Sequence, residues 1–322
     1  MRRAFELLRL LADGEEHAGA AIAEQLGVTR AAVWNQIERL RDEGVDIAAS
    51  SANGYQLVGG FEFLDSQLIS GGLRAERDFA GLTVETLDVT TSTNQLLLDA
   101  SNKEDIHQRI VFADYQTAGR GRRGDRWMSP PGSGLCFSVG WRFDTPPATF
   151  SALSLVVGVA MVEALRGLAI DGLALKWPND VVRNGKKLAG ILIEMRSEAG
   201  GPSVVVIGIG LNIRMSAAAK SMIDRPADDL DSAAGQRLSR NVVAGRLVNE
   251  LLRTLLDFAD SGFDPYRERW LGLDALADRT VTIEIGTRSV TGVARGVDEH
   301  GAFLIEHDGT CEKFLAGHLR DF

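Results

Sequence analysis

Gly119-Arg120-Gly121-Arg122-Arg123-Gly124, followed directly by Asp125-Arg126-Trp127-Met128-Ser129-Pro130-Pro131-Gly132, is the stretch of sequence that decides the fold. Its first six residues match the GxGxxG pattern of dinucleotide-binding domains, and they follow a predicted strand over residues 110–115. In such a domain the glycines open a helix whose N-terminus holds the pyrophosphate. Here two prolines and further glycines follow, which predicts another loop. The sequence therefore argues against a Rossmann fold.

The arginines of residues 119–126, which we call the arginine loop, give this segment a chemistry of its own. Guanidinium groups match phosphate oxygens with two parallel hydrogen bonds. We therefore expect the arginine loop to close over a polyanionic ligand. A solvated basic loop is the simpler alternative, and the motifs that surround it in the chain weaken that interpretation.

Residues 63–272, on both sides of the arginine loop, are predicted to form a mixed α/β domain. Hydrophobic periodicity predicts helices over residues 93–100, 151–168 and 242–258, the first of them capped by Ser92 or Thr93. Short apolar runs between turn residues predict strands over residues 110–115, 135–141, 181–183, 188–195 and 204–209. Short turns connect several of these strands, so we expect a mixed sheet.

Three further motifs stand at the ends of predicted strands: Lys176-Trp177-Pro178-Asn179-Asp180, Lys186-Lys187-Leu188-Ala189-Gly190 and Gly208-Ile209-Gly210-Leu211-Asn212. Asp180 is placed to hold an arginine of the loop or a metal ion. Lys187 would be fixed at the mouth of a buried strand. The glycines remove side chains from a pocket wall. Trp177 and Pro178 are expected to pack rather than to bind.

Residues 1–62 predict a winged helix-turn-helix. Apolar residues at helical spacing indicate helices over residues 4–11 and 20–26, and Thr29 is a good N-cap for a third helix. Two strands over residues 45–48 and 55–58 flank Asn53-Gly54, a dipeptide suited to a hairpin turn. Helix, turn, helix and hairpin is the layout of a DNA-binding module.

The third helix would read DNA, because burying its apolar side turns polar residues outward. Arg30, Asn35 and Arg39 are the candidates for contacts with bases or phosphates. Residues 1–60 nevertheless hold six Arg and nine Asp or Glu, so phosphate neutralisation is thin. A small helical domain that binds protein is therefore the alternative.

Composition limits the remaining possibilities. Hydrophobic residues make up 45% and charged residues 25% of the 322 residues, as in ordinary globular proteins. The longest apolar run, over residues 153–165, is too short for a bilayer, and no apolar segment of a signal peptide follows the N-terminal arginines. We expect no membrane span and a cytoplasmic protein. The histidines and cysteines show no metal-binding spacing.

Residues 273–322 are predicted to form a small β-barrel, since only short strands with glycine turns occur there: residues 280–285, 289–297, 302–307 and 311–315. The net charge of −9 means that any contact with DNA must be local. The expected architecture is thus a multidomain α/β protein with a winged helix-turn-helix, a central mixed sheet and a barrel.

Taken together, Ser92-Thr93-Asn94, the arginine loop with Trp127, and the three strand-end motifs occur in the order and spacing of the biotin-protein ligases. The resemblance covers nearly the whole chain. With the winged helix in front and the barrel behind, the chain is similar to the bifunctional form that also represses biotin-synthesis genes. The resemblance implies a central domain like that of class II synthetases and an SH3-like barrel. Lipoate ligases share some of these motifs.

The resemblance also implies roles for individual residues. Biotin would be held by Ser92, Thr93, Asn94, Gln116, Gly119, Arg120, Arg122, Lys187, Gly190, Gly208 and Gly210. The adenylate would be held by Arg120, Arg122, Arg123, Trp127, Lys176, Asn179, Asp180, Lys187 and Asn212. Catalysis would fall to Lys187, Arg120, Arg122 and Lys176. Asp125 departs from the family, because many relatives carry a basic residue there.

The implied reaction needs no enzyme nucleophile. Biotin's carboxylate attacks the α-phosphate of ATP, with Mg²⁺ carried by the nucleotide, and the lysine of a biotin carboxyl carrier protein then attacks the acyl carbon. The protein aligns two anions and neutralises charge. The family further implies a homodimer when biotinyl-AMP is bound, and operator DNA as a partner. A lipoate-protein ligase and a repressor that only senses biotin are the alternatives.

Overall fold

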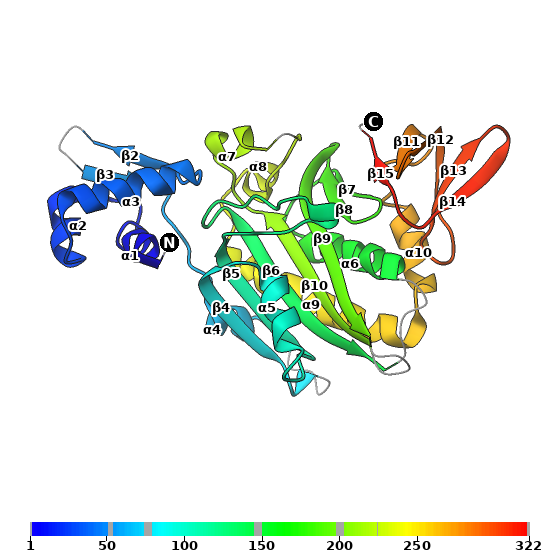
Figure 1. Cartoon of the computed structure of the whole chain (residues 1–322), viewed down its shortest axis with the longest axis horizontal. Coiled ribbons are helices and arrows are strands. Elements are labelled where there is room, and N and C mark those ends of the chain that lie inside the picture. The colour runs from blue at the N-terminus through cyan, green and yellow to red at the C-terminus, as the bar shows by residue number, and fades with distance from the viewer. Residues whose placement is uncertain are drawn as a thin grey trace.

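The computed structural model describes residues 2–50, 54–73, 79–144, 150–197, 203–223 and 225–320. Three parts follow one another across the molecule: the helix-turn-helix part, a large central sheet with its helices, and a small all-β part (Figure 1). The expected succession of a winged helix, a mixed α/β domain and a β domain is confirmed. The exact domain boundaries at residues 62 and 272 stay predictions.

The winged helix contains three helices and a three-stranded sheet: α1 (Arg2–Leu10), β1 (Glu16–Ala18), α2 (Gly19–Gln25), α3 (Arg30–Asp42), β2 (Ile47–Ala49) and β3 (Gly54–Leu57). Thr29 caps α3 as predicted, because its side chain accepts a hydrogen bond from Ala32 N at 3.2 Å. Val33, Ile37 and Leu40 of α3 are buried in a core that belongs to this part. Strand β1 was not predicted, and Asn53 lies outside the described residues.

The central sheet has seven strands in the order β4-β5-β6-β10-β9-β8-β7. Within the described residues, the β4–β5 pair is the only parallel pair of this sheet, so the sheet is mixed, as expected. The strands are β4 (Thr83–Thr90), β5 (Arg109–Gln116), β6 (Gly134–Phe143), β7 (Leu173–Lys176), β8 (Asp180–Arg183), β9 (Lys186–Ser197) and β10 (Ser203–Asn212). Strands β4 and β7, at the two edges, were missed from the sequence.

Helices cover both faces of this sheet. α6 (Phe150–Leu165) and α9 (Arg240–Ser261) pack on each other and on one face, while α5 (Thr93–Ala100) packs on β5, β6 and β10. Since α6 lies between the sheet and other helices, its sequence is apolar on almost every side. The shorter helices are α4 (Ser66–Gly71), α7 (Ala217–Ser221), α8 (Leu230–Ala234) and α10 (Asp264–Leu271).

The C-terminal part is a five-stranded antiparallel sheet in the order β14-β13-β12-β11-β15. Its strands are β11 (Thr280–Ile285), β12 (Arg288–Val297), β13 (Phe303–His307), β14 (Thr310–Phe314) and β15 (His318–Leu319). We keep the name barrel for residues 273–320. Its buried residues, such as Ile283 and Phe303, belong to the same hydrophobic cluster as the central sheet.

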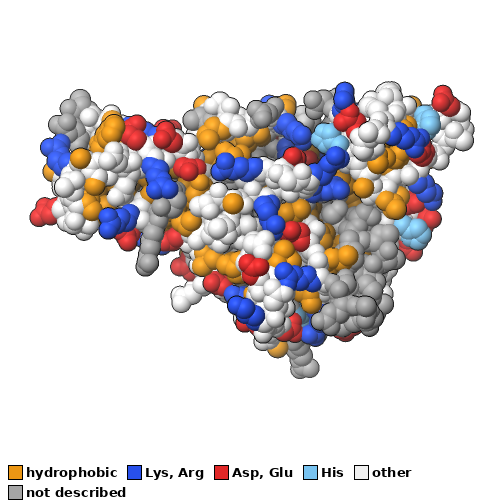
Figure 2. All heavy atoms as spheres, viewed as in Figure 1, with side chains coloured by type: hydrophobic (Ala, Val, Ile, Leu, Met, Phe, Trp, Pro, Cys, Tyr) orange, Lys and Arg blue, Asp and Glu red, His pale blue; other side chains and the backbone are white. Residues whose placement is uncertain are grey.

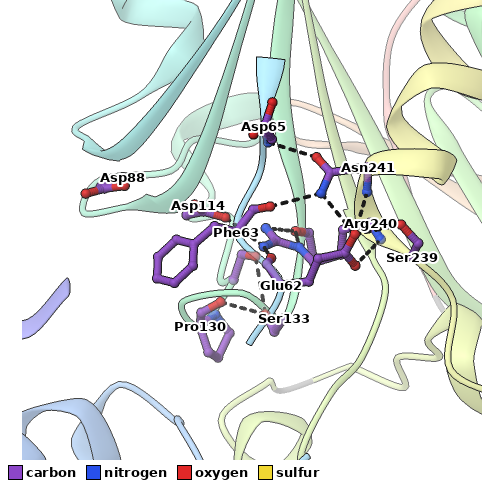
Figure 3. A network of polar contacts seen from close by, with 12 residues as sticks. Glu62, Phe63, Asp65, Asp88, Asp114, Pro130, Ser133, Ser239, Arg240 and Asn241 are labelled. Atoms are coloured by element: carbon purple, nitrogen blue, oxygen red, sulfur yellow. Dashed lines mark hydrogen bonds and ion pairs between the residues drawn. The ribbon is translucent and has the colours of Figure 1, made fainter. Parts of the chain in front are cut away.

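A polar network ties the segment after the winged helix to the central domain (Figure 3). Glu62 accepts hydrogen bonds from Ser239 Oγ and from the backbone N of Arg240, at the start of α9. The Arg240 side chain lies 2.6 Å from Asp114 Oδ1, and both side chains are 3% exposed. It also donates to Gly134 O. Burial raises the pKa of Asp114 and the neighbouring Arg240 opposes that rise.

The described residues contain no helix that is both long and apolar enough to cross a bilayer. They also contain no group of three or more His, Cys, Asp or Glu side chains arranged to hold a metal ion.

Candidate active site

A cavity of about 520 Å³ lies where the arginine loop, α5, the ends of several sheet strands and the barrel meet. Lys and Arg side chains lie on the surface along the upper edge of the central domain in this view, between the winged helix and the barrel (Figure 2). The cavity is lined by the predicted ligand-binding residues, with the exception of Gly119: Ser92, Thr93, Asn94, Gln116, Arg120, Arg122, Arg123, Trp127, Lys176, Asn179, Asp180, Lys187, Gly190, Gly208, Gly210 and Asn212.

One end of the cavity is neutral and hydrogen-bonded. Ser92 caps α5 by accepting from Gln95 N, which places Thr93 and Asn94 in the first turn of the helix. All three side chains are almost fully buried. Gln116, the last residue of β5, accepts a hydrogen bond from Thr93 N at 2.8 Å. This end can recognise a small neutral polar group.

The arginine loop starts beside that neutral end. Arg120 Nη2 lies 2.8 Å from Glu194 Oε2 on β9. Gly121 N donates to Asp125 O at 2.7 Å, and the backbones of Arg120 and Arg126 form an isolated antiparallel β-bridge. The loop therefore doubles back on itself. Arg123 adopts a φ of 57° at its turn, a conformation uncommon outside glycine. Asp125 also lines the cavity, where it lowers the positive potential of the loop.

The other end of the cavity is cationic. Lys187 Nζ lies 2.7 Å from Asp180 Oδ1, an ion pair that lacks the directionality of a hydrogen bond. Burial lowers the pKa of Arg122, and the nearby Asp180 carboxylate partly offsets this. Asp180 is therefore paired with Lys187 and lies near enough to Arg122 to influence its charge. Clustered cations of this kind can bind phosphate oxygens.

Trp127 forms part of the wall between the two ends. A Cβ added to Gly210 would lie 2.3 Å from its ring, and a Cβ added to Gly190 would lie 3.2 Å from it. Lys187 Nζ lies 5.6 Å from the centre of the same ring. The two glycines are required because the indole lies directly on the strand backbones.

The 176–180 motif is held by the barrel. Trp177 is 1% exposed and stacks on Phe303 with 5.2 Å between ring centres. Its Nε1 donates to Gly301 O at 3.2 Å. Pro178 follows through a cis peptide bond, and its carbonyl accepts from Ser154 Oγ. Trp177 and Pro178 thus pack, as expected, and fix the backbone of Lys176 and Asn179.

Two of the predicted ligand-binding residues, Asn179 and Asn212, already use their side-chain NH₂ groups in hydrogen bonds to the protein backbone. Asn179 Nδ2 donates to Ile191 O at 2.6 Å, and Asn212 Nδ2 donates to Asp228 O at 3.1 Å. Their carbonyl oxygens are the groups left for a ligand. Both side chains also fix the loops that enclose the cavity.

Several cavity residues escaped the sequence reasoning: Phe137, Met222, Ile223, Arg225, Gly317, His318 and Leu319. Glu194, which pairs with Arg120, was missed as well. The alternation along β9 could have placed Glu194 on one face with Leu192. No local signal marks His318, because the barrel brings it to the cavity from more than 100 residues away.

The predicted DNA-contacting residues lie on α3 of the winged helix (Figure 1), and none of them lines the cavity. Arg30, Asn35 and Arg39 are all exposed there. Trp34, which the sequence analysis did not single out, is 54% exposed on the same helix.

Comparisons with known proteins agree with this arrangement. Residues 86–212 match the biotin/lipoate A/B protein ligase family, residues 3–56 an HTH domain, and residues 278–318 the biotin protein ligase C-terminal domain. The bifunctional ligase/repressor BirA of Escherichia coli is 40% identical over 315 residues, which are 98% of this chain and 96% of that protein. BirA of Bacillus subtilis is 31% identical over 96% of this chain and 94% of its own.

Among solved structures, the biotin protein ligase from Aquifex aeolicus in complex with biotin and ATP superposes with a TM-score of 0.66. It is 26% identical, and the match covers 74% of this chain and 99% of that one. Sequence, fold and site agree over nearly the whole length, so this chain belongs to the bifunctional biotin-protein ligases, enzymes that carry an N-terminal helix-turn-helix repressor domain.

Proposed function

We propose that the cavity condenses biotin with ATP to biotinyl-5′-AMP with release of pyrophosphate. It then presents the activated acyl group to a lysine of a biotin carboxyl carrier protein, whose amine displaces AMP. The observation that carries the assignment is the division of one cavity into a neutral hydrogen-bonded end and a cationic end. Biotin's ureido ring suits the first end and the phosphates of ATP suit the second. The ligand pair named for the Aquifex aeolicus structure supports this division.

In this proposal the ureido ring is held by Ser92, Thr93 and Gln116, and the acyl carboxylate lies toward Lys187. Arg120, Arg122 and Arg123 order over the adenylate, and Lys176 assists the phosphates. Gly190, Gly208 and Gly210 shape the wall. These cations act by positioning and by stabilising charge that grows on the α-phosphate, so no covalent enzyme intermediate is required.

Mg²⁺ fits this site as a companion of ATP rather than as a resident ion. Asp180 is the carboxylate at the cationic end, with Asn179 beside it, and the phosphates would supply the other oxygen ligands. The ion would neutralise phosphate charge during adenylation. Lys187 already neutralises Asp180, so the ion and the lysine would share this carboxylate.

The test is intact-mass analysis of a biotin carboxyl carrier domain incubated with the protein, ATP and Mg²⁺, with biotin or lipoate in parallel. A single biotin adduct and no lipoate adduct is expected. A lipoate-only adduct would instead establish a lipoate-protein ligase, and no adduct with either would favour a repressor that only senses biotin. Lys187→Ala should slow adenylate formation by about 100-fold or more, since one charged contact to the transition state is worth about 3 kcal/mol.

We also propose that the winged helix binds operator DNA as a homodimer when biotinyl-AMP is bound, and that the protein works in the cytoplasm. The exposed Arg30, Asn35 and Arg39 on α3 support the DNA contact. In fluorescence anisotropy, Arg39→Ala should weaken binding and reduce the slope of log K against log salt by about 1. Sedimentation with and without the adenylate tests the dimer, and identical sedimentation would refute it.

A further inference from the structure

Six side chains beneath the neutral end of the cavity form one continuous hydrogen-bonded chain. We call it the polar relay, and it consists of Gln116, Thr93, Ser138, Asn94, Glu194 and Arg120. We propose that Ser138 and Glu194, acting through Asn94, fix the direction of the hydrogen bond at the Thr93 hydroxyl, while the backbone N of Thr93 fixes the Gln116 amide. Thr93 can then only accept from the ligand, and Gln116 can only donate to it. The proposal rests on the assignment of this end to biotin.

The orientation of the Asn94 amide is settled by its neighbours. Its Nδ2 lies 2.9 Å from Glu194 Oε2 and 3.2 Å from Leu192 O. A carboxylate and a peptide carbonyl are acceptors only, so the NH₂ group must point at them. Asn94 Oδ1 therefore faces Ser138 Oγ at 2.5 Å, and the Ser138 hydroxyl must donate to it.

The opposite end of the relay is settled by a backbone donor. Thr93 N donates to Gln116 Oε1 at 2.8 Å, so the carbonyl of that amide faces the protein. The Nε2 group, with its two N–H donors, is the part that remains for a ligand. A Cβ on Gly119 would lie 3.2 Å from this Nε2. Glycine at that position keeps the approach to the amide open.

The hydroxyl of Thr93 is then left with one role. Ser138 Oγ, 2.7 Å away, has already given its proton to Asn94, and Gln116 Oε1, 3.2 Å away, is an acceptor. Whichever of the two Thr93 chooses, its own proton points into the protein. Only oxygen lone pairs of Thr93 remain for the cavity.

This pattern is complementary to a cyclic urea. The ureido ring of biotin carries two N–H donors and one carbonyl acceptor, so one N–H meets Thr93 Oγ1 and the carbonyl meets Gln116 Nε2. Ser138 and Glu194 touch no ligand in this arrangement and are positioning residues. Because Thr93, Asn94 and Ser138 are buried, a group that presents the wrong polarity leaves unpaired donors behind, and each of these should weaken binding by about tenfold or more.

Gly208 provides an independent reason to place Asn94 behind the ligand rather than against it. A Cβ there would lie 2.1 Å from Asn94 Oδ1 and would block its contact with Ser138. Glycine on β10 thus serves the relay in addition to widening the pocket. Ser138 itself is fully buried on β6.

The test uses isothermal calorimetry on the full chain without ATP, with three ligands. Biotin is the reference. Dethiobiotin keeps the urea but lacks the sulfur, and 2-iminobiotin replaces the urea carbonyl with an imine N–H. The variants are Ser138→Ala, Asn94→Asp, Glu194→Gln and the double variant Asn94→Asp/Glu194→Gln. Thr117→Ala, adjacent to Gln116 but outside the relay, is the matched control.

Asn94→Asp should weaken biotin binding by about 100-fold, because a carboxylate would oppose Glu194 and Leu192 O. Glu194→Gln alone should cost little. In the double variant the new amide at position 194 can donate to the new carboxylate at position 94, so about tenfold of the loss should return. Ser138→Ala should weaken biotin, dethiobiotin and 2-iminobiotin in parallel by about tenfold, because all three ligands present a ring N–H to Thr93 and the Gln116 amide stays fixed by Thr93 N.

Two results would overturn the proposal: equal losses in Asn94→Asp and in the double variant, or an unchanged affinity for all three ligands in Ser138→Ala. Thermal unfolding of each variant, measured in parallel, separates a loss of affinity from a fold defect. If the unmodified protein binds no biotin at all, the proposed function fails. If it binds biotin and the variants keep its affinity, only the relay fails.

Discussion

The two junctions of the central domain are built in opposite ways. At the barrel, apolar contact dominates: Trp177 stacks on Phe303, and the buried residues of both parts form one cluster. At the winged helix, a separate core reaches the sheet at Tyr115 and the partly buried Val89, and the polar network around Arg240 and Glu62 secures the connecting segment. A shared core makes two parts unfold together, whereas a polar junction between two cores allows one to move without the other.

The largest expected effect is at the barrel. Trp177→Ala should lower the free energy of unfolding by about 3–5 kcal/mol, as for other buried aromatic residues replaced by alanine. Denaturant unfolding followed by circular dichroism should show the sheet and the barrel losing structure in one shifted transition. Trp34→Ala, on the exposed side of α3, is the matched control and should change stability by less than about 0.5 kcal/mol. A barrel that unfolds separately would contradict the shared core.

The polar junction is broken by Arg240→Met, which leaves Asp114 buried without its partner. We expect a loss of about 3 kcal/mol at pH 7, since removing one member of a buried pair strands the other charge. The loss should shrink as the pH falls, because burial raises the pKa of Asp114 and without Arg240 nothing opposes that rise, which favours the neutral carboxyl. Arg240→Met/Asp114→Leu should recover part of the stability. A double variant no better than the single one would mean that the pair is not coupled.

A buried carboxyl at the barrel junction predicts a pH dependence. Asp274 accepts from Leu276 N, while its Oδ2 is buried without a partner among the described residues, and burial raises its pKa to about 6. A raised pKa means that the folded state holds the proton more tightly than the unfolded state. The contribution of Asp274 to the free energy of unfolding is therefore complete below about pH 4 and is lost as pH rises through 6. Asp274→Asn should reduce this pH-dependent loss in the free energy of unfolding by about 1–2 kcal/mol. If the urea midpoints of the unmodified protein and of Asp274→Asn change with pH in the same way between pH 4 and 7, the prediction is wrong.

The smallest effect is expected at the contact between the two cores. Tyr115→Phe removes the 2.6 Å hydrogen bond to Glu43 at the end of α3, at a cost of about 1 kcal/mol. Hydrogen exchange should quicken in α3 and leave β10 unchanged. Burial and Glu43 raise the pKa of Tyr115, so the contribution of Tyr115 is present at neutral pH and is lost as pH rises above 10. Faster exchange in β10 as well would show that the two cores are not independent.

The elements that sequence predicted well are those with local causes. Thr29 caps α3 by itself, and the prolines after the arginine loop exclude a helix whatever surrounds them. Strand β4 was missed because it lies at the sheet edge, where partial burial leaves no clean alternation. Strand β7 is only four residues long and is defined by its pairing with β8 and with the segment near Asp274.

The site shows the same division. Residues such as Gln116 and Lys187 were identified through the family resemblance, and the structure brings them to one cavity. Glu194 was not identified, because a carboxylate on a strand ordinarily indicates a solvated position. Only the fold shows that Arg120 and Asn94 lie beside it. Which atom of an amide faces the ligand depends on several distant partners at once, and no local pattern encodes that.

The single core of sheet and barrel also bears on how the protein is made. The winged helix can close most of its core while the ribosome is still translating the sheet, because the buried residues of that core, Tyr115 apart, come before residue 60. The central sheet cannot, since Phe303 and its neighbours cover Trp177 only after the barrel has emerged. During synthesis the chain therefore offers a folded DNA-binding part well before it has a catalytic cavity. Because the proposed operator binding requires a homodimer that holds biotinyl-AMP, such a nascent chain would not yet repress.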